Sequence, residues 1–244
     1  PGDVLLGDPN RLAYLVFTSG SSGSPKPVAH AHRAVWARRM MWQGWYGLTP
    51  EDRVLHAGAF NWTFTLGTGL LDPWAIGATA LIPAQGIAPE ALPLLLKRHD
   101  ATIFAAAPGL FRKLTASGAT LALPKLRHGL SAGEKLPEAL RQRWQDATGT
   151  PVHEALGMSE CSTFISGSPA RPAPAGTLGF PQPGRRIAIL SDDTTPVATG
   201  KTGILAIHGT DPGLCLGYRR PDGTLDLPLT DDWFLTGDLV SENP

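Results

Sequence analysis

The feature that most constrains the fold is the alternation of strand-like and helix-like segments through the middle of the chain. Short apolar runs such as residues 53–58 and 101–108 alternate with segments of helical character. The clearest of these helical segments, residues 137–148, has a proline at its start and Gly149 past its end. Strands and helices that alternate in this way predict an α/β fold: a mainly parallel sheet flanked by helices, with ligands at the carboxyl ends of the strands.

The composition changes near residue 170. Residues 168–184 are rich in proline and glycine, and the short strand-like runs beyond them are separated by turn signals such as Pro221-Asp222-Gly223. This pattern is typical of a small antiparallel β-barrel or sheet. We therefore expect an α/β subdomain over residues 1–169 and a small β-rich subdomain over residues 170–244.

Charge and cysteine content exclude several classes of protein. Lys plus Arg and Asp plus Glu each number 21, and the basic residues 33–39 are interpreted as the solvent-facing side of a helix, so we expect no nucleic acid partner. No apolar run has the length of a membrane span, and no secretory signal opens the chain, so we expect no membrane partner. Cys161 and Cys215 lie far apart, which favours a cytoplasmic protein with no disulfide framework and no zinc site.

The stretch FTSGSSGSPKPVAH, residues 17–30, has two interpretations. Serine-glycine runs form flexible connectors, but this run follows a strand-like segment, YLVF, and precedes a helix expected over residues 32–45. That position favours a loop in which small residues turn backbone N–H groups toward a phosphate, with hydroxyls and a lysine close by. The residues that would form this loop are Thr18, Ser19, Gly20, Ser21, Ser22, Gly23 and Lys26.

The spacing of this loop excludes the Walker A type. Lys26 does not follow a glycine, and Pro27 comes after it, so the pattern G-x-x-x-x-G-K-[ST] fails. The stretch instead resembles the phosphate-binding signature of the adenylate-forming superfamily, which contains acyl-CoA synthetases, luciferases and peptide-synthetase adenylation domains. Ser22 stands where threonine is usual, and Pro27 stands where glycine is usual and removes one backbone donor.

Three downstream motifs extend the resemblance over nearly the whole chain. SAGEKLP, residues 131–137, is similar to the turn beside the adenine pocket, with Gly133 and Glu134 at the matching positions. EALGMSE, residues 154–160, resembles the Y-G-x-T-E motif. The resemblance implies that Ser159 meets the α-phosphate, that Glu160 holds Mg²⁺, and that Leu156 and Gly157 border the nucleotide, Leu156 in place of the commoner tyrosine.

WFLTGD, residues 233–238, resembles the family's T-G-D motif and implies that Asp238 binds the ribose hydroxyls. The stretch around Asn61-Trp62 resembles the aromatic motif of benzoate and medium-chain acyl-CoA ligases, which implies that it borders the acyl site. The expected acid-binding residues are Phe60, Trp62, Ala132 and Gly157, and Phe64 is a further candidate for an apolar pocket.

Each of these residues also has an ordinary structural interpretation. Taken alone, Glu160 could be a capping or surface carboxylate, Asp238 a turn former and Trp62 a core aromatic. His30, His32 and His153 are interpreted as structural or surface residues. The joint occurrence of the motifs in the family's order favours the functional interpretation.

The resemblance implies a reaction in two steps with ATP, Mg²⁺ and coenzyme A. A carboxylic acid, aryl or medium-chain, attacks the α-phosphate to give an acyl-adenylate, and a thiol then displaces AMP. Lys26, Ser159 and Glu160 are the expected catalytic residues. The family's N-terminal subdomain and C-terminal lid domain are not in the sequence, so we expect a central fragment that is inactive or nearly so.

Two alternatives remain open. The protein could be an adenylation domain that loads a carrier protein, although Phe60-Asn61 lacks the aspartate that usually binds an amino-acid substrate's amine. It could also be a non-catalytic nucleotide-binding module, with Pro27 and Leu156 as signs of decay.

Overall fold

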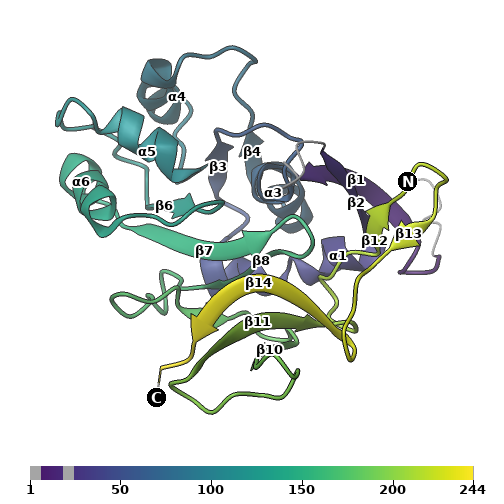
Figure 1. Cartoon of the computed structure of the whole chain (residues 1–244). Coiled ribbons are helices and arrows are strands. Elements are labelled where there is room, and N and C mark those ends of the chain that lie inside the picture. Colours follow the sequence, from purple (N-terminus) through teal and green to yellow (C-terminus); the bar gives the residue numbers. More distant parts are fainter. Residues whose placement is uncertain (1–6, 19–24, 244) are drawn as a thin grey trace. The chain divides into compact units, whose positions relative to one another are not determined.

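The computed structural model describes residues 7–18 and 25–243 (Figure 1). The chain forms two compact units, one built from Pro1–Ala37 and Gly184–Pro244 and the other from Arg38–Pro183. We refer to them as unit 1 and unit 2 and describe each by itself.

Unit 2 contains the alternating part of the sequence. Its strands are β3 (Arg53–His56), β4 (Thr79–Leu81), β5 (Ile103–Ala106), β6 (His128–Ser131), β7 (Val152–Met158), β8 (Ser162–Ser166) and β9 (Phe180–Pro181). Its α-helices are α2 (Thr63–Leu66), α3 (Asp72–Ile76), α4 (Leu92–Arg98), α5 (Pro108–Leu114) and α6 (Glu138–Thr148). Three further turns are the π-helical η1 (Trp42–Tyr46) and η2 (Gly67–Leu71) and the 3₁₀-helical η3 (Pro89–Ala91).

These strands form one seven-stranded sheet in the order β4-β3-β5-β6-β7-β8-β9. The pairs from β4 to β7 are parallel, and β8 and β9 add to the edge in antiparallel pairs. This arrangement confirms the predicted α/β class with a mainly parallel sheet.

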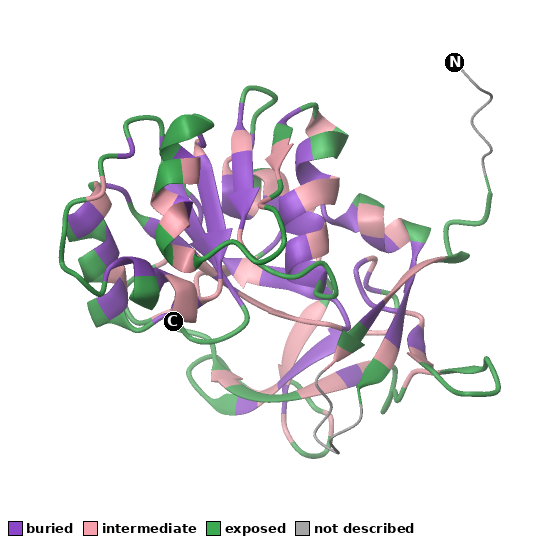
Figure 2. Cartoon of the chain, turned by 90° about the horizontal axis from the view of Figure 1, so that it is seen from above, coloured by how far each residue is buried: buried purple, intermediate pink, exposed green. Residues whose placement is uncertain are grey.

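Both faces of the sheet are covered, which explains why its strands read as continuous apolar runs. In β5, Phe104 and Ala106 pack into the cluster that contains residues of α4, α5 and α6, whereas Ile103 and Ala105 pack into the cluster around Trp45. Alternate side chains of a strand point to opposite faces, so every residue of β5 is buried (Figure 2). Helix α6 ends at Gly149, whose φ of +73° is the left-handed conformation that glycine adopts without strain.

Unit 1 is mainly antiparallel β structure. Its elements are β1 (Leu12–Thr18), β2 (Lys26–Ala31), α1 (His32–Ala37), β10 (Ile187–Leu190), β11 (Thr202–His208), β12 (Gly217–Arg219), β13 (Leu225–Asp226) and β14 (Trp233–Ser241). They form a four-stranded sheet, β1-β2-β12-β13, and a three-stranded sheet, β10-β11-β14. The short antiparallel strands expected after residue 170 are therefore present.

The serine-glycine loop does not lead directly into a helix, so this part of the prediction is wrong. Strand β2 follows the loop and pairs with β1 in an antiparallel hairpin, with Thr18 opposite Lys26. The helix expected over residues 32–45 begins at His32, after β2, and α1 itself ends at Ala37. Strand β2 is short, and its second neighbour, β12, comes from the far end of the chain.

The compact units divide the chain differently from the expected boundary at residue 170. The hairpin that carries the loop belongs to unit 1, together with the C-terminal strands, and residues 170–183 belong to unit 2 because β9 joins its sheet. The expected subdomains, residues 1–169 and 170–244, stay a prediction about the domain organisation of the intact protein.

Arg38 is buried and Arg33 is half-buried, which corrects the interpretation of residues 33–39 for these two arginines, whereas Trp36 and Arg39 are exposed. Arg33 donates hydrogen bonds to the backbone carbonyls of Pro212 (2.8 Å) and Leu214 (2.7 Å) in unit 1.

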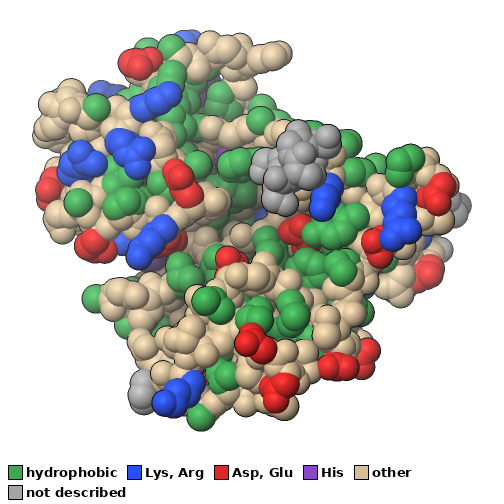
Figure 3. Space-filling model, in the orientation of Figure 1, with side chains coloured by type: hydrophobic (Ala, Val, Ile, Leu, Met, Phe, Trp, Pro, Cys, Tyr) green, Lys and Arg blue, Asp and Glu red, His purple; other side chains and the backbone are tan. Residues whose placement is uncertain are grey.

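On the face shown in Figure 3, side chains of both charge signs are interspersed. None of the helices in the described residues is long and apolar enough to cross a membrane.

Candidate active site

The expected site residues of unit 2 gather along one edge of its sheet. Phe60 and Trp62 follow β3, Gly133 follows β6, and Gly157 lies near the end of β7. These three strands run parallel, so their carboxyl ends lie at the same edge. This is the edge at which open α/β sheets bind ligands.

Trp62 lies against Gly133. A Cβ atom on Gly133 would lie 3.4 Å from Cζ3 of the Trp62 ring, and the φ of Gly133 is +97°, in the region that favours glycine. Glu134, the next residue, is exposed and approaches the start of α5, where its Oε1 is 4.0 Å from the Cβ position of Gly109. The structure thus brings the aromatic motif and the SAGEKLP turn together.

The aromatic side chains at this edge differ in how far they are exposed to solvent. Phe60 and Trp62 are 39% and 45% exposed, which is unusual for core aromatics, whereas Phe64 is 6% exposed and packs edge-on against His56. Phe64 is therefore a core residue, which is the ordinary interpretation of an aromatic in this motif. Ala132 is buried below the edge. Phe60 borders a cavity of about 530 Å³ that lies at the carboxyl ends of β3 and β4.

The turn between β7 and β8 carries the residues expected to contact phosphate and metal. Gly157 pairs with Thr163 at a bulge, and a Cβ atom on it would lie 2.5 Å from the Ser162 carbonyl oxygen, closer than any real contact. Only glycine allows the two strands to approach so closely here. Leu156 pairs with Ile165 and is half-buried.

Glu160 is 8% exposed, so it is neither a surface carboxylate nor a helix cap. Ser159 is half-buried in the same turn. The turn is anchored at its end because Arg38 donates a hydrogen bond from Nη1 to Oγ of Ser162, whose φ is +60°.

Arg38 belongs to a buried polar network. Its Nη2 lies 2.6 Å from Oδ2 of Asp72 and 3.0 Å from the Tyr46 hydroxyl, and the side chains of Arg38 and Asp72 are each 3% exposed. The Cβ position of Gly67 falls within the guanidinium, so glycine is required there. Burial and the Asp72 carboxylate raise the pKa of Tyr46 well above its usual value of 10.0, which keeps the hydroxyl as a donor to Asp72 at 2.8 Å.

Sequence reasoning missed this network. Arg38 was grouped with exposed basic residues, and Asp72 lies in an apolar stretch. A lone acidic residue within that stretch was the available signal, because a carboxylate is rarely buried without a cationic partner.

In unit 1, Thr18 is the last residue of β1 and Lys26 is the first residue of β2, so they flank the loop and lie opposite each other. The Lys26 ammonium is 5.6 Å from the ring centroid of Tyr218 on β12, a cation–π distance. Tyr218 is a second residue that sequence reasoning missed. The other expected loop residues, Ser19, Gly20, Ser21, Ser22 and Gly23, lie outside the described residues.

Asp238 lies on β14 and is exposed. Gly237 before it has a φ of +81°, opposite the point where the register between β11 and β14 shifts, and the Asp238 amide donates to Oγ1 of Thr236 at 3.1 Å. The bulge turns Asp238 out of the regular strand pattern.

The donor chemistry fits the expected Mg²⁺. A glutamate oxygen is a hard ligand, and Mg²⁺ usually takes one or two carboxylates together with phosphates and water. Within the part of the chain that the structure describes, no three His, Cys, Asp or Glu side chains form a metal cluster. Glu160 would therefore be a single protein ligand to a metal that arrives with nucleotide.

The profile of the AMP-binding enzyme family matches residues 3–219. The chain belongs to this family. Among curated relatives, it is 32% identical over 238 residues to the "3-hydroxybenzoate--CoA/4-hydroxybenzoate--CoA ligase" of Thauera aromatica, covering 96% of this chain and 45% of the relative. It is 30% identical over 247 residues to the benzoate--CoA ligase of the same organism, with the same two coverages. The chain thus spans less than half the length of these relatives.

Two solved structures of CoA ligases match the fold of this chain. The anthranilate CoA ligase AuaEII in complex with anthranoyl-AMP matches with a TM-score of 0.81 and 27% identity, covering 95% of this chain and 45% of that one. A benzoate CoA ligase from Burkholderia xenovorans LB400 matches with a TM-score of 0.83 and 25% identity, covering 98% and 48%. The predicted membership of the adenylate-forming superfamily is confirmed.

Proposed function

We propose that this chain is the nucleotide- and acid-binding core of an AMP-forming acid–CoA ligase whose substrate is an aryl carboxylic acid. The observation that carries the proposal is the packing of Trp62 against Gly133 at the carboxyl edge of the sheet, the edge at which β7 leads into the turn with Glu160. The names of the relatives, which are benzoate, hydroxybenzoate and anthranilate ligases, support the substrate class.

The overall reaction balances in two steps. An acid and ATP give an acyl-adenylate and pyrophosphate, and the thiol of coenzyme A then displaces AMP to form a thioester. The acid is itself the nucleophile of the first step, so the protein has to hold the reactants in line and neutralise charge.

The residues of this chain divide these tasks. Lys26 carries a cationic charge for the phosphates, and the Tyr218 ring holds its ammonium near the end of the hairpin. Asp238 is exposed and accepts hydrogen bonds from ribose hydroxyls. Ser159 offers a hydroxyl donor to the α-phosphate.

Glu160 would hold the magnesium ion, which when bound supplies charge stabilisation to the phosphates. Arg38 keeps the turn of Glu160 in place through Ser162. Leu156 and Gly157 at the end of β7 border the nucleotide and the acid.

The acid would bind against apolar surface. Trp62, Phe60, Ala132 and Gly157 offer ring faces and backbone with little polar surface, which suits an aromatic ring. Coenzyme A is the proposed acceptor, as in the named relatives. We also propose a cytoplasmic location, which is supported by the thiol form of both buried cysteines.

The test uses the intact protein that contains this chain. ATP–pyrophosphate exchange is measured with a panel of benzoates, medium-chain fatty acids and amino acids, followed by thioester formation with coenzyme A or a carrier protein. We expect exchange with benzoates, and Glu160→Gln should reduce it at least about a hundredfold because the loss of metal charge costs several kcal/mol.

Glu51→Gln is the matched control, since Glu51 is exposed and belongs to none of the site motifs. Exchange that prefers fatty acids or amino acids would contradict the aryl substrate class. Nucleotide binding without exchange on any acid would contradict the ligase activity and favour a non-catalytic module.

A further inference from the structure

A second pocket lies at the opposite edge of the unit 2 sheet. It has a volume of about 410 Å³, and its walls include the amino ends of β6 and β7, helix α6 and the proline-rich residues 172–177. The candidate active site lies at the carboxyl ends of the same strands, so this pocket is a separate feature. Glu154, the first residue of the EALGMSE motif, lines this pocket, but none of the residues expected to contact nucleotide, metal or acid does.

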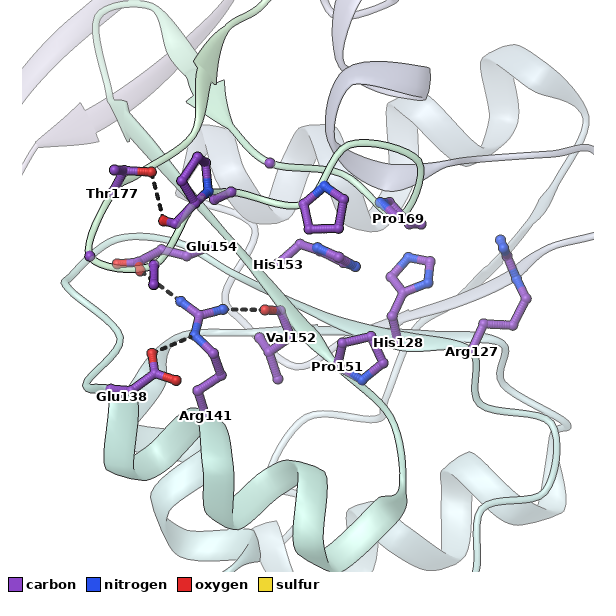
Figure 4. Close-up of a pocket in the computed structure, with 16 residues that line it drawn as sticks. Arg127, His128, Glu138, Arg141, Pro151, Val152, His153, Glu154, Pro169 and Thr177 are labelled. Carbon is purple, nitrogen blue, oxygen red and sulfur yellow. Dashed lines mark hydrogen bonds and ion pairs between the residues drawn. The ribbon is translucent and has the colours of Figure 1, made fainter. Parts of the chain in front are cut away.

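Two histidines lie side by side at this pocket (Figure 4). His128 and His153 are 2% and 7% exposed, and their rings meet edge to face with centroids 5.4 Å apart. In each ring the Nε2 atom is buried and has no hydrogen-bond partner among the described residues. Buried polar atoms are normally satisfied, so a pair of adjacent unsatisfied nitrogens needs an explanation.

The tautomer of His128 is set by the backbone. Its ring makes a hydrogen bond with the backbone of Tyr46 that favours the protonated form, and Nε2 has no partner. Nδ1 is therefore the donor, and Nε2 carries a lone pair. A ring nitrogen that donates to a carbonyl while the other stays bare is the usual arrangement of a metal-binding histidine.

The charges around the pair are already compensated. Arg127 lies 2.7 Å from Asp52, and Arg141 lies 3.2 Å from both Glu138 and Glu154. Figure 4 shows these contacts of Arg141 as dashed lines. Each guanidinium faces at least one carboxylate, which offsets part of its repulsion of a cation.

The geometry points to a site for a first-row transition-metal dication, such as Zn²⁺ or Co²⁺, bound through Nε2 of His128 and of His153. Two imidazoles on one tetrahedral ion, with nitrogens about 2 Å from the metal, have ring centres roughly 5 Å apart, close to the separation seen here. Imidazole nitrogen suits zinc and its neighbours better than Mg²⁺ or Ca²⁺. Residues 7–18 and 25–243 hold no third side chain grouped with the pair, so water in the pocket supplies the remaining ligands.

The test is a titration of the chain, freed of any affinity tag and of metal, with Co²⁺ followed by its visible d–d absorption. We expect saturation at one ion per chain and displacement by Zn²⁺. His128→Phe and His153→Phe should each weaken Co²⁺ binding more than about tenfold. His208→Phe, in unit 1, is the matched control and should leave binding unchanged.

A second measurement does not depend on the variants. Zn²⁺ should raise the melting temperature of the unchanged chain, and the rise should grow with zinc concentration because only the folded site binds the ion. His128→Gln and His153→Asn serve if the phenylalanine variants do not fold. The site would be overturned by the lack of a saturable cobalt spectrum, by the lack of a zinc-dependent shift, or by histidine variants that bind Co²⁺ as tightly as the unchanged chain.

Discussion

The buried pair of Arg38 and Asp72 predicts a large and specific loss of stability. Asp72 accepts three hydrogen bonds from Arg38, at 2.6, 3.0 and 3.1 Å, and one from Tyr46 at 2.8 Å. Asp72→Asn removes the carboxylate that faces the buried guanidinium of Arg38. Breaking a buried ion pair from one side costs about 3–5 kcal/mol, and we expect a loss in this range.

The assay is urea unfolding followed by tryptophan fluorescence and far-UV circular dichroism. Removing both charges in Arg38→Met/Asp72→Ala should cost less than the sum of the single losses, because no unpaired charge remains. Arg127→Met is the control, since the Arg127 side chain is 41% exposed and its partner Asp52 keeps hydrogen bonds from Thr49 and Thr102. It should cost only about 1 kcal/mol.

Two results would refute this reasoning. One is a loss below about 1 kcal/mol for Asp72→Asn, which would mean that water or another group compensates Arg38. The other is strict additivity in the double variant, which would mean that the two side chains are not coupled.

Three further predictions follow from single residues. Burial, followed by the charge of Arg38, lowers the pKa of His56 from 6.5 to about 3, so the unfolded chain binds the extra proton between these pH values. The free energy of unfolding therefore carries no penalty from His56 above pH 6.5 and falls as the pH is lowered toward 3, by up to about 1.4 kcal/mol per pH unit. His56→Phe should remove this pH dependence from urea unfolding curves. Gly157→Ala should destabilise unit 2 by about 1–3 kcal/mol through its clash with Ser162, whereas Gly149→Asn, with open space around it, should cost little in thermal unfolding. Asp238→Asn should weaken nucleotide binding about tenfold in calorimetry without changing the melting temperature, because its side chain is exposed; unchanged affinity would remove Asp238 from the ribose site.

The unit 2 sheet was predictable because its signals are local. Each parallel strand is a short apolar run, and α6 has a proline before its first turn and a left-handed glycine after its last. The motif residues after β6 and β7 could also be placed at the carboxyl edge, since parallel strands align their ends.

What could not be predicted depends on partners that are distant in sequence. The neighbours of β2 are set by its pairing with β12, and residues 29–31 carry no turn or alternation signal that separates a strand from a helix. The burial of Arg38 depends on Asp72 and Ser162, which come from a helix and a strand far along the chain. Local patterns cannot specify such pairs, because nothing near Arg38 in the sequence supplies the compensating charge.

The hairpin that carries the serine-glycine loop has a consequence for the order of folding. Ala29 of β2 pairs with Gly217 of β12, about 190 residues later, whereas unit 2 is one continuous segment between them. During synthesis unit 2 can fold as soon as it emerges, but the hairpin waits for β12 with one edge of β2 unpaired. Because that long loop has to close first, we expect the hairpin sheet to form late in folding.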